Sequence, residues 1–359
     1  MTKTLNLLFP VLLLLVFSCA PAVDDKTKVI TDNEADTGRL NDLPSGQGLS
    51  IVFYNTENLY DTIDSPGTDD TEFTPEARIP WTAKRFNTKL DRLADVFSSV
   101  ASPAMPDIIG LAEVENKFVL ERLLKTGKMK SAAYGIVHFD SPDERGSDVA
   151  LLYKKSSFDV VTAQPLKVKI LNTGDRTRDI LYVKGRTKSG EVLHLFVNHW
   201  PSRREGTELT EFKRIETAKT LRRQVDNILD TDPSARIVIM GDFNDEPGSR
   251  SIREVLSAKQ PRPPYAPAEL YNLLYDDFKA GKGTTYFKDW DMFDQLIVSG
   301  SLLKGSAGLR CTPESASIFS PDRLIHKDRN GKSRPNRTMG DKYFGGYSDH
   351  LPVVLKLEE

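Results

Sequence analysis

The sequence predicts an α/β domain in which buried β-sheet is covered by helices. From Leu49 onward, short apolar segments alternate with segments whose apolar residues recur at helical spacing. The short segments contain few polar residues, which is typical of strands buried on both faces. Residues 49–359 contain no internal repeat and no clean linker, so we expect one large domain there.

The first helix is expected where Phe86, Leu90, Leu93, Phe97 and Val100 are spaced four, three, four and three residues apart. This spacing places them on one helix face. Two further helices are predicted over residues 116–125 and 208–229.

The expected strands share an apolar composition and lie between polar or glycine-containing turns. They cover residues 49–54, 108–112, 148–153, 180–186, 192–198, 236–240, 295–298 and 351–357. The fourth and fifth of these predict a hairpin around Lys188-Ser189-Gly190.

The first 18 residues have the layout of a secretory signal. Lys3 is the only charge before position 24, residues 5–17 are apolar, and Ser18 and Cys19 follow. The apolar run is shorter than the ~20 residues that span a bilayer. We therefore expect residues 1–18 to be a signal peptide, with a retained membrane helix as the alternative.

Residues 16–19 (Val-Phe-Ser-Cys) resemble a bacterial lipobox. The resemblance implies cleavage before Cys19 and lipidation of its thiol, with ordinary secretion as the alternative. The polar residues 19–48 would then be a flexible tether between lipid and domain. The expected location is the bacterial cell envelope, on the periplasmic side or the outer-membrane surface, with membrane contact through the lipid anchor alone.

The net charge and the cysteine content exclude some classes of protein. Cys311 is the only other cysteine, so lipidation of Cys19 leaves no partner for an intrachain disulfide. The net charge of −2 excludes a globally basic nucleic-acid-binding protein, but a local basic patch or a metal can still attract a polyanion. Residues 322–342 hold seven Lys or Arg against three Asp, and this segment either faces solvent or faces the substrate.

Polar clusters follow several predicted strands. They are Asn55-Thr56-Glu57-Asn58, Glu113, Asn198-His199-Trp200 and Gly241-Asp242-Phe243-Asn244. Strand ends meet at one rim of a sheet, where α/β sites are usually built. Carboxylates gathered there would repel one another, and a hard cation such as Mg²⁺ or Mn²⁺ would resolve this. The histidines are too few and too separated for a strong zinc motif, so phosphate-ester chemistry is indicated.

The clusters resemble those of the endonuclease/exonuclease/phosphatase superfamily, in family order from Val52 to Val354. The resemblance rests on Asn55-x-Glu57, on Leu-Ala-Glu at 111–113, on Gly-Asp-Phe-Asn at 241–244 and on Ser-Asp-His-Leu-Pro-Val at 348–353. It implies a deoxyribonuclease I-like, four-layer α-β-β-α sandwich of two mixed sheets.

The resemblance also implies a metal site. Glu57 and Glu113 would hold the principal ion, and Asp349 would add a metal or second-site ligand. Mg²⁺ is the expected ion, with Mn²⁺ or Ca²⁺ as alternatives. The alternative for Glu57 is a surface residue, since glutamates are mostly exposed.

The catalytic residues implied by the resemblance are His199, Asp242, Asn244, Asp294 and His350. Asp242 would orient or deprotonate the attacking water. His350 would donate to a phosphate oxygen while Asp294 holds its other nitrogen. Asn244 would bind the phosphate and the surroundings of the metal, and His199 matches a histidine of the deoxyribonuclease and sphingomyelinase branches.

Three of these assignments have competitors. Asp242 and Asn244 could merely cap a turn. Asp291 rivals Asp294, which is preferred because it directly precedes a predicted strand, as the family's Asp does.

Four further residues are expected to contact the substrate or to support the site. Asn55 would bind phosphate. Arg145 and Arg203 are candidates because an arginine can clamp phosphate through two bonds, and Asp148 is a candidate in the same segment as Arg145. Surface ion pairs are the alternative for the last three. His138 and His194 are expected to be structural, and His326 to be solvated.

The motifs leave three functions open. The first is a monomeric, metal-dependent endonuclease-like phosphodiesterase acting on nucleic acid. The second is a phosphatase or sphingomyelinase-like phosphodiesterase acting on small or lipid phosphate esters, and the same residues would serve it. The third is an inactive surface-binding protein, which the retention of every expected catalytic position disfavours.

Overall fold

The computed structural model of the protein describes residue 1 and residues 48–101, 104–171, 173–305 and 308–359. All but the first residue of the predicted signal peptide, the predicted lipidation site Cys19 and nearly all of the predicted tether lie outside the described residues. Among the helices of the described residues, none combines the length and apolar character needed to cross a bilayer.

The first sheet contains six strands. They are β1 (Leu49–Leu59), β2 (Ile108–Val114), β3 (Tyr134–His138), β4 (Asp148–Lys154), β14 (Ala316–Ile318) and β17 (Val353–Leu357). Their order is β14-β17-β1-β2-β4-β3. β1 runs parallel to β2, and both pair antiparallel with their other neighbours, so the sheet is mixed.

The second sheet contains seven strands. They are β5 (Phe158–Leu166), β6 (Ile180–Thr187), β7 (Val192–His199), β8 (Ile237–Asp242), β9 (Ala258–Lys259), β10 (Leu270–Asn272) and β13 (Asp294–Ser299). Their order is β5-β6-β7-β8-β13-β10-β9, with β7 parallel to β8 and β13 antiparallel to β8.

Helices and two small hairpins complete the described structure. The α-helices are α1 (Ala83–Val100), α2 (Lys117–Leu124), α3 (Thr207–Thr231), α4 (Tyr275–Lys279) and α5 (Gly300–Lys304). Short helical turns are η1 (Thr71–Phe73), η2 (Gly127–Ser131), η3 (Ser251–Val255), η4 (Pro313–Ser315) and η5 (Asp322–Leu324). The hairpins pair β11 (Thr285–Tyr286) with β12 (Trp290–Asp291) and β15 (Ile325–Lys327) with β16 (Ser333–Pro335).

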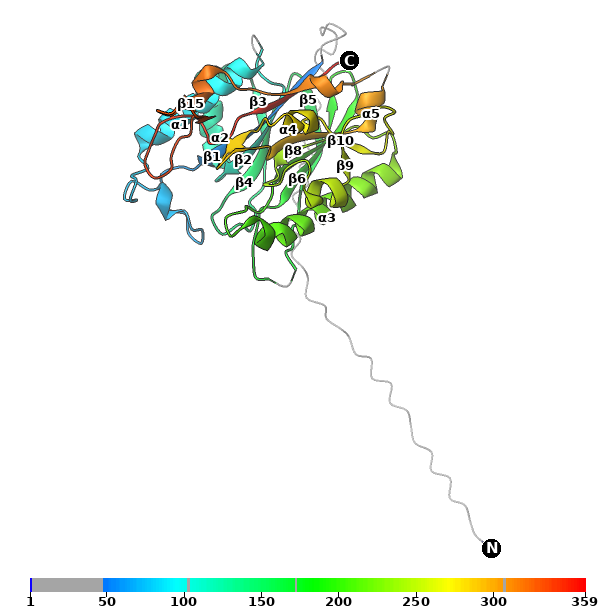
Figure 1. The fold of residues 1–359 in the computed structure, drawn as a ribbon, viewed down its shortest axis with the longest axis horizontal. Helices are drawn as coiled ribbons and strands as arrows, with labels where there is room; N and C mark the ends of the chain where they lie inside the picture. The colour runs from blue at the N-terminus through cyan, green and yellow to red at the C-terminus, as the bar shows by residue number, and fades with distance from the viewer. Residues whose placement is uncertain (2–47, 102–103, 172, 306–307) are drawn as a thin grey trace.

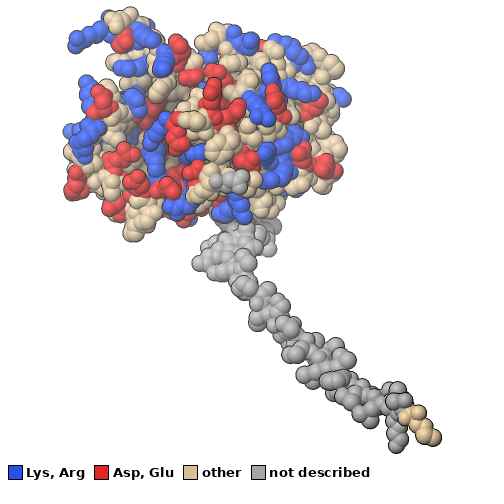
Figure 2. Space-filling model, turned by 60° about the horizontal axis from the view of Figure 1, so that its bottom comes forward, with Lys and Arg blue, Asp and Glu red and all other residues tan. Residues whose placement is uncertain are grey.

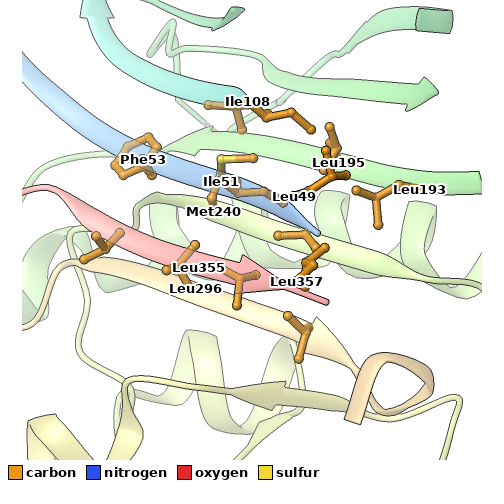
Figure 3. Close-up of a cluster of buried hydrophobic side chains, with 14 of the residues drawn as sticks. Leu49, Ile51, Phe53, Ile108, Leu193, Leu195, Met240, Leu296, Leu355 and Leu357 are labelled. Atoms are coloured by element: carbon orange, nitrogen blue, oxygen red, sulfur yellow. The ribbon is translucent and has the colours of Figure 1, made fainter. Parts of the chain in front are cut away.

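The two sheets pack face to face across a shared apolar core, shown in Figure 3. In β1, Ile51 and Phe53 point into this core, where they meet Leu195 and Met240 of the second sheet. The alternate residues Val52 and Tyr54 point to the opposite face, and all four β1 side chains are fully buried. This double burial explains why β1 is apolar from Ile51 to Tyr54.

Helices cover the outer face of each sheet (Figure 1). The predicted face of α1 packs with α2 against the outer residues of β1 and β2. α3 packs against the outer residues of β7 and β8 through Leu221 and Val225. The four-layer α-β-β-α sandwich is therefore confirmed.

Local sequence signals set the helix starts. The Thr82 side chain accepts a hydrogen bond from the Arg85 amide at the start of α1, and Asn116 caps α2 in the same way through the Val119 amide. The helices predicted over 116–125 and 208–229 lie within two residues of their expected bounds, and α1 contains all five residues of the predicted helix face.

The charged side chains of both signs are interspersed over the face shown in Figure 2. This distribution agrees with the small net charge of −2. Attraction for a polyanion must therefore be a local property of the site and its surroundings.

Candidate active site

Strand register gathers the polar clusters at one rim of the sandwich. Asn55 in β1 lies opposite Ala112 in β2, directly before Glu113. In the other sheet, His199 of β7 pairs with Asp242 of β8, which pairs in turn with Asp294 of β13. Because β1 and β2 are parallel, as are β7 and β8, each pair delivers its polar residues at the same end.

Asn55 joins the two sheets at this rim. Its Nδ2 donates to Asp242 Oδ2 at 2.9 Å and lies 3.3 Å from Glu113 Oε1. Its Oδ1 accepts from the Glu57 amide at 2.9 Å. Since Asn55 and Asp242 are both buried, this bond fixes the distance between the sheets at the site.

His350 and Asp294 form a buried ion pair. His350 Nδ1 lies 2.7 Å from Asp294 Oδ2, and His350 Nε2 lies 3.8 Å from Asp242 Oδ2. Burial alone would lower the pKa of His350, but the Asp294 carboxylate outweighs it and holds this pKa well above its usual range. The imidazole is therefore charged at neutral pH, and its Nε2–H is directed to the centre of the site.

His199 differs from His350 in its protonation state. Its Nε2 lies 3.7 Å from Asp242 Oδ2 and 4.0 Å from Glu113 Oε1. Burial, together with the positive charge of Arg178, lowers its pKa well below the usual range, so the ring is neutral. Among the described residues its Nδ1 is buried without a hydrogen-bond partner.

Asp242 lies at the centre of the site. Its Oδ1 accepts from the Asn244 amide at 2.9 Å, and its Oδ2 accepts from Asn55. Burial raises its pKa to about 6, and the charge on His350 limits the rise. A carboxylate that is ionised at neutral pH and has a raised pKa is suited to accept a proton from water.

Asn244 is held by its neighbours. Its Nδ2 donates to the Trp200 carbonyl at 2.9 Å, and its carbonyl accepts from Arg203 Nε at 2.7 Å. Arg203 also bonds Asp245, which pairs with the fully buried Arg214. Arg203 thus supports the loop that follows Asp242.

The backbone of the site is unusual. Six non-glycine residues of the described chain have positive φ, and four of them are Glu57, Asn58, Glu113 and Asn244. The left-handed conformation is uncommon for such residues, and its concentration here indicates that the surrounding structure enforces it. At Glu113 it turns the carboxylate so that Oε2 accepts from the Asn58 amide at 2.8 Å.

Glu57 and Asp349 are linked through Arg337 of the basic segment. Arg337 Nε donates to Glu57 Oε1, and Arg337 Nη2 donates to Asp349 Oδ2, both at 3.1 Å. Burial and the Asp349 charge raise the pKa of Glu57, whereas Lys89 and Arg337 oppose the rise. Glu57 is thus a buried member of the site, and residues 322–342 reach the site through Arg337.

The remaining predicted residues lie in the surrounding structure. Arg145 Nη2 donates to Asn58 Oδ1 at 2.7 Å, so its guanidinium lies next to the Glu57-Asn58 turn. Asp148 accepts from Ser141 and lies 3.0 Å from His138 Nε2, which ties together the ends of β3 and β4. The structure therefore brings nine predicted residues into one connected network and places Arg145, Asp148 and Arg203 around it. The nine are Asn55, Glu57, Glu113, His199, Asp242, Asn244, Asp294, Asp349 and His350.

The donor set suits a divalent cation at Glu113. Its carboxylate is only partly buried and is oriented by the amides of Asn55 and Asn58. Mg²⁺ is commonly held by one or two carboxylates together with waters and substrate phosphate. In the described chain, ligand atoms of three His, Cys, Asp or Glu residues gather within 4.8 Å in two groups: His138, Asp140 and Asp148, and Asp242, Asp294 and His350. The predicted trio of Glu57, Glu113 and Asp349 is not one of these groups.

Sequence reasoning did not single out several supporting residues. Arg178 donates to the carbonyls of His199 and Trp200, and Lys89 Nζ donates to the Tyr347 carbonyl. Arg178 lies in an irregular polar segment that gives no signal. Lys89 occupies the buried face of α1, where a lone lysine in an apolar helix stripe is a detectable anomaly.

Comparisons with known proteins identify the family and the fold. A family model described as "Endonuclease/Exonuclease/phosphatase family" matches residues 50–359. No curated protein sequence matches significantly.

Solved structures share the fold at low sequence identity. D. rerio TDP2 complexed with single-strand DNA product is 16% identical, with a TM-score of 0.52 over 88% of this chain and 99% of that one. The human Nocturnin catalytic domain with bound sulfate is 17% identical, with a TM-score of 0.51 over 86% and 94%. A Bacteroides thetaiotaomicron mannosyl-6-phosphatase is 14% identical, with a TM-score of 0.52 over 86% and 99%.

Proposed function

The chain belongs to the endonuclease/exonuclease/phosphatase family, an enzyme family that hydrolyses phosphate esters, and we propose that its substrate is nucleic acid and its metal Mg²⁺. The observation that carries the proposal is the position of Asp242. Its carboxylate lies within 3.8 Å of two imidazoles, the neutral ring of His199 and the positively charged ring of His350. It also accepts a hydrogen bond from Asn55 of the other sheet. This arrangement provides a base and an acid on either side of one small volume.

In the proposed mechanism, Asp242 orients a water molecule and accepts its proton as the water oxygen attacks phosphorus. The ester P–O bond breaks in the same step, and the leaving oxygen takes a proton from solvent water. The raised pKa, caused mainly by burial, makes this carboxylate a better base than an exposed aspartate. Asn55 and the Asn244 amide hold Asp242 in place, so little reorganisation is needed during the reaction.

The charged His350 stabilises negative charge on the phosphate. Its Nε2–H donates to an oxygen of the phosphate as negative charge develops there, and Asp294 keeps the ring protonated and oriented. His199, which is neutral, faces the same volume from β7 and contributes to phosphate positioning.

Glu113 would hold the divalent ion. Asn55 contacts two carboxylates, those of Asp242 and Glu113, and the Glu113 carboxylate is the partly exposed one. When bound, such an ion neutralises charge on the phosphate oxygens. Mg²⁺ is proposed over a softer ion because the surrounding ligands are oxygens.

A polymeric substrate is favoured by charges outside the catalytic centre. The β15–β16 hairpin exposes Lys327, Arg329, Lys332 and Arg334, and the chain continues from it to Arg337 in the site. Cations at a distance from the scissile bond stabilise a polyanion that extends beyond the site, and a small phosphate ester cannot reach them. The TDP2 structure named above, with its bound DNA product, is consistent with this substrate class.

The test is hydrolysis by the purified chain of plasmid DNA, RNA, sphingomyelin, inositol phosphates and mannose 6-phosphate, with Mg²⁺ or EDTA. We expect Mg²⁺-dependent cleavage of nucleic acid, and a loss of at least ~10³-fold in Asp242→Ala with an unchanged circular dichroism spectrum. Asp159→Ala, which removes an exposed carboxylate paired with Lys188, should retain full activity. Intact DNA and RNA alongside rapid turnover of a small ester would refute the nuclease proposal, and an active Asp242→Ala would refute the mechanism.

A further inference from the structure

The Glu57–Asp349 side of the site already contains a cation from the chain itself. The Arg337 guanidinium is bonded to both carboxylates at 3.1 Å, and its side chain is 40% exposed. A planar guanidinium can bridge two carboxylates and remains charged at any physiological pH. It therefore neutralises a pair of acidic groups that would otherwise require another positive charge.

The Glu57 carboxylate has little capacity left for a metal ion. Besides Arg337, it accepts from the Thr338 amide at 2.5 Å and from the Met339 amide at 3.2 Å. Its side chain is 3% exposed. A metal bound by Glu57 would have to displace charge-assisted bonds that are already formed and shielded from water.

The segment that supplies these donors is anchored from the opposite side. Lys89 Nζ, which is buried in α1, donates to Thr338 Oγ1 and to the Tyr347 carbonyl, both at 2.6 Å. Thr338 Oγ1 also donates to the Tyr347 carbonyl at 3.0 Å. Residues 337–339 are therefore held between α1 and Glu57.

Electrostatics also disfavours a second metal here. A divalent cation close to Arg337 would be repelled by the guanidinium at short range in a partly desolvated site. Glu113 has no bond to Arg337 among the described residues, and its carboxylate is oriented instead by the Asn55 side chain and the Asn58 amide. It remains the available metal-binding carboxylate.

We propose that Arg337 permanently neutralises the Glu57–Asp349 side of the site, and that the site binds a single divalent ion, which Glu113 holds. The proposal rests on the proposed metal-dependent function and specifies its metal content. Arg337 uses Nε and Nη2 for the two carboxylates, and since a guanidinium has five N–H donors, others remain for a substrate phosphate.

The first test counts bound Mn²⁺ by electron paramagnetic resonance on the purified chain and three variants. We expect one tightly bound ion in the wild type, in Arg337→Lys and in the control Arg334→Gln, which removes an exposed arginine of β16. Arg337→Gln should bind two ions, because it removes the cation that bonds both Glu57 and Asp349 and leaves the buried Lys89 as the nearby positive charge. Two ions in the wild type, or one ion of unchanged affinity in Arg337→Gln, would overturn the proposal.

The second test needs no variant and therefore remains valid if Arg337→Gln fails to fold. A crystal of the wild-type chain grown with Mn²⁺ should give one anomalous peak in the site, at Glu113, with Arg337 still bonded to Glu57 and Asp349. A peak between Glu57 and Asp349 would refute the proposal. Neither readout depends on hydrolysis, so failure of the proposed substrate would be recognised separately from failure of this assignment.

Discussion

Asp242 determines how activity should depend on pH on the acid side. Its pKa is raised to about 6, mainly by burial, and only the ionised carboxylate can accept the proton of water. We therefore expect kcat/KM to rise about tenfold per pH unit up to pH 6 and then to level off. The measurement is a pH–rate profile with a soluble oligonucleotide at fixed ionic strength.

His350 should not limit activity near neutral pH, because its partnership with Asp294 keeps the ring charged well above the usual range. The falling alkaline limb should therefore lie well to the basic side of neutrality. An acid limb near pH 4, the usual range of an exposed aspartate, would contradict the role given to Asp242.

At the residue scale, the sequence is most informative where a functional side chain directly follows an apolar strand. Asp242, His199 and Glu113 could be selected in this way, because strand ends converge on one rim. Arg337 could be recognised only as one charge of a basic segment. Its contact with Glu57 spans 280 positions of the chain, and no local pattern encodes such a distance.

Asp148 illustrates the converse. It was predicted to contact the substrate or to support the site, and in the structure it accepts a hydrogen bond from the Ser141 amide and lies beside His138. A polar residue at a strand start can serve either role, and only the position of its partner distinguishes them.

At the element scale, the close approach of β7 and β8 positions His199 beside Asp242. Gly241 permits it: a Cβ there would lie 2.5 Å from the Asn198 carbonyl oxygen and 2.9 Å from Asn198 Cα. Backbone atoms cannot rotate away, so Gly241→Ala must separate the strands. We expect it to reduce the unfolding free energy by roughly 1–3 kcal/mol and kcat by at least tenfold.

Urea unfolding and steady-state kinetics would check this prediction. Gly174→Ala is the matched control, since nothing lies within 4 Å of an added Cβ there. An unaltered kcat in Gly241→Ala would show that the spacing of β7 and β8 does not determine the geometry of the site.

Element prediction from the sequence depended on burial. Strand β8 and the first half of β1 are apolar at nearly every position, and they were found because both of their faces are covered. β5 was missed, since it is an edge strand with many exposed or half-exposed positions and no clear alternation. Strand order was equally inaccessible from residue patterns, because pairing joins segments far apart in the chain, and the resemblance supplied only the four-layer architecture.

At the scale of the whole molecule, each sheet contributes an incomplete set of groups. The first sheet provides Asn55 and Glu113, and the second provides His199, Asp242 and Asp294. Packing of the inter-sheet core therefore does more than stabilise the fold, because it fixes the distance across which Asn55 reaches Asp242. The site exists only when both sheets have docked.

The placement of the enzyme in the cell is proposed from residues 16–19 rather than from the fold. We propose that Cys19 is lipidated after cleavage and that residues 19–48 tether the catalytic domain to the membrane. Stable anchoring requires more than one acyl chain, since each buried methylene adds about 0.8 kcal/mol and a single chain binds reversibly. The wild type expressed in a bacterium that processes lipoproteins should incorporate radioactive palmitate and sediment with membranes.

Cys19→Ala should abolish the label and move the protein to the soluble fraction, while the purified protein keeps its hydrolytic activity. Cys311→Ala is the matched control, because this cysteine is buried in the inter-sheet core and inaccessible to acylation. Label retained in Cys19→Ala would refute the anchor. If activity is lost together with the label, the anchor contributes to the active enzyme. We do not expect this result, because Cys19 is far in sequence from every residue of the site.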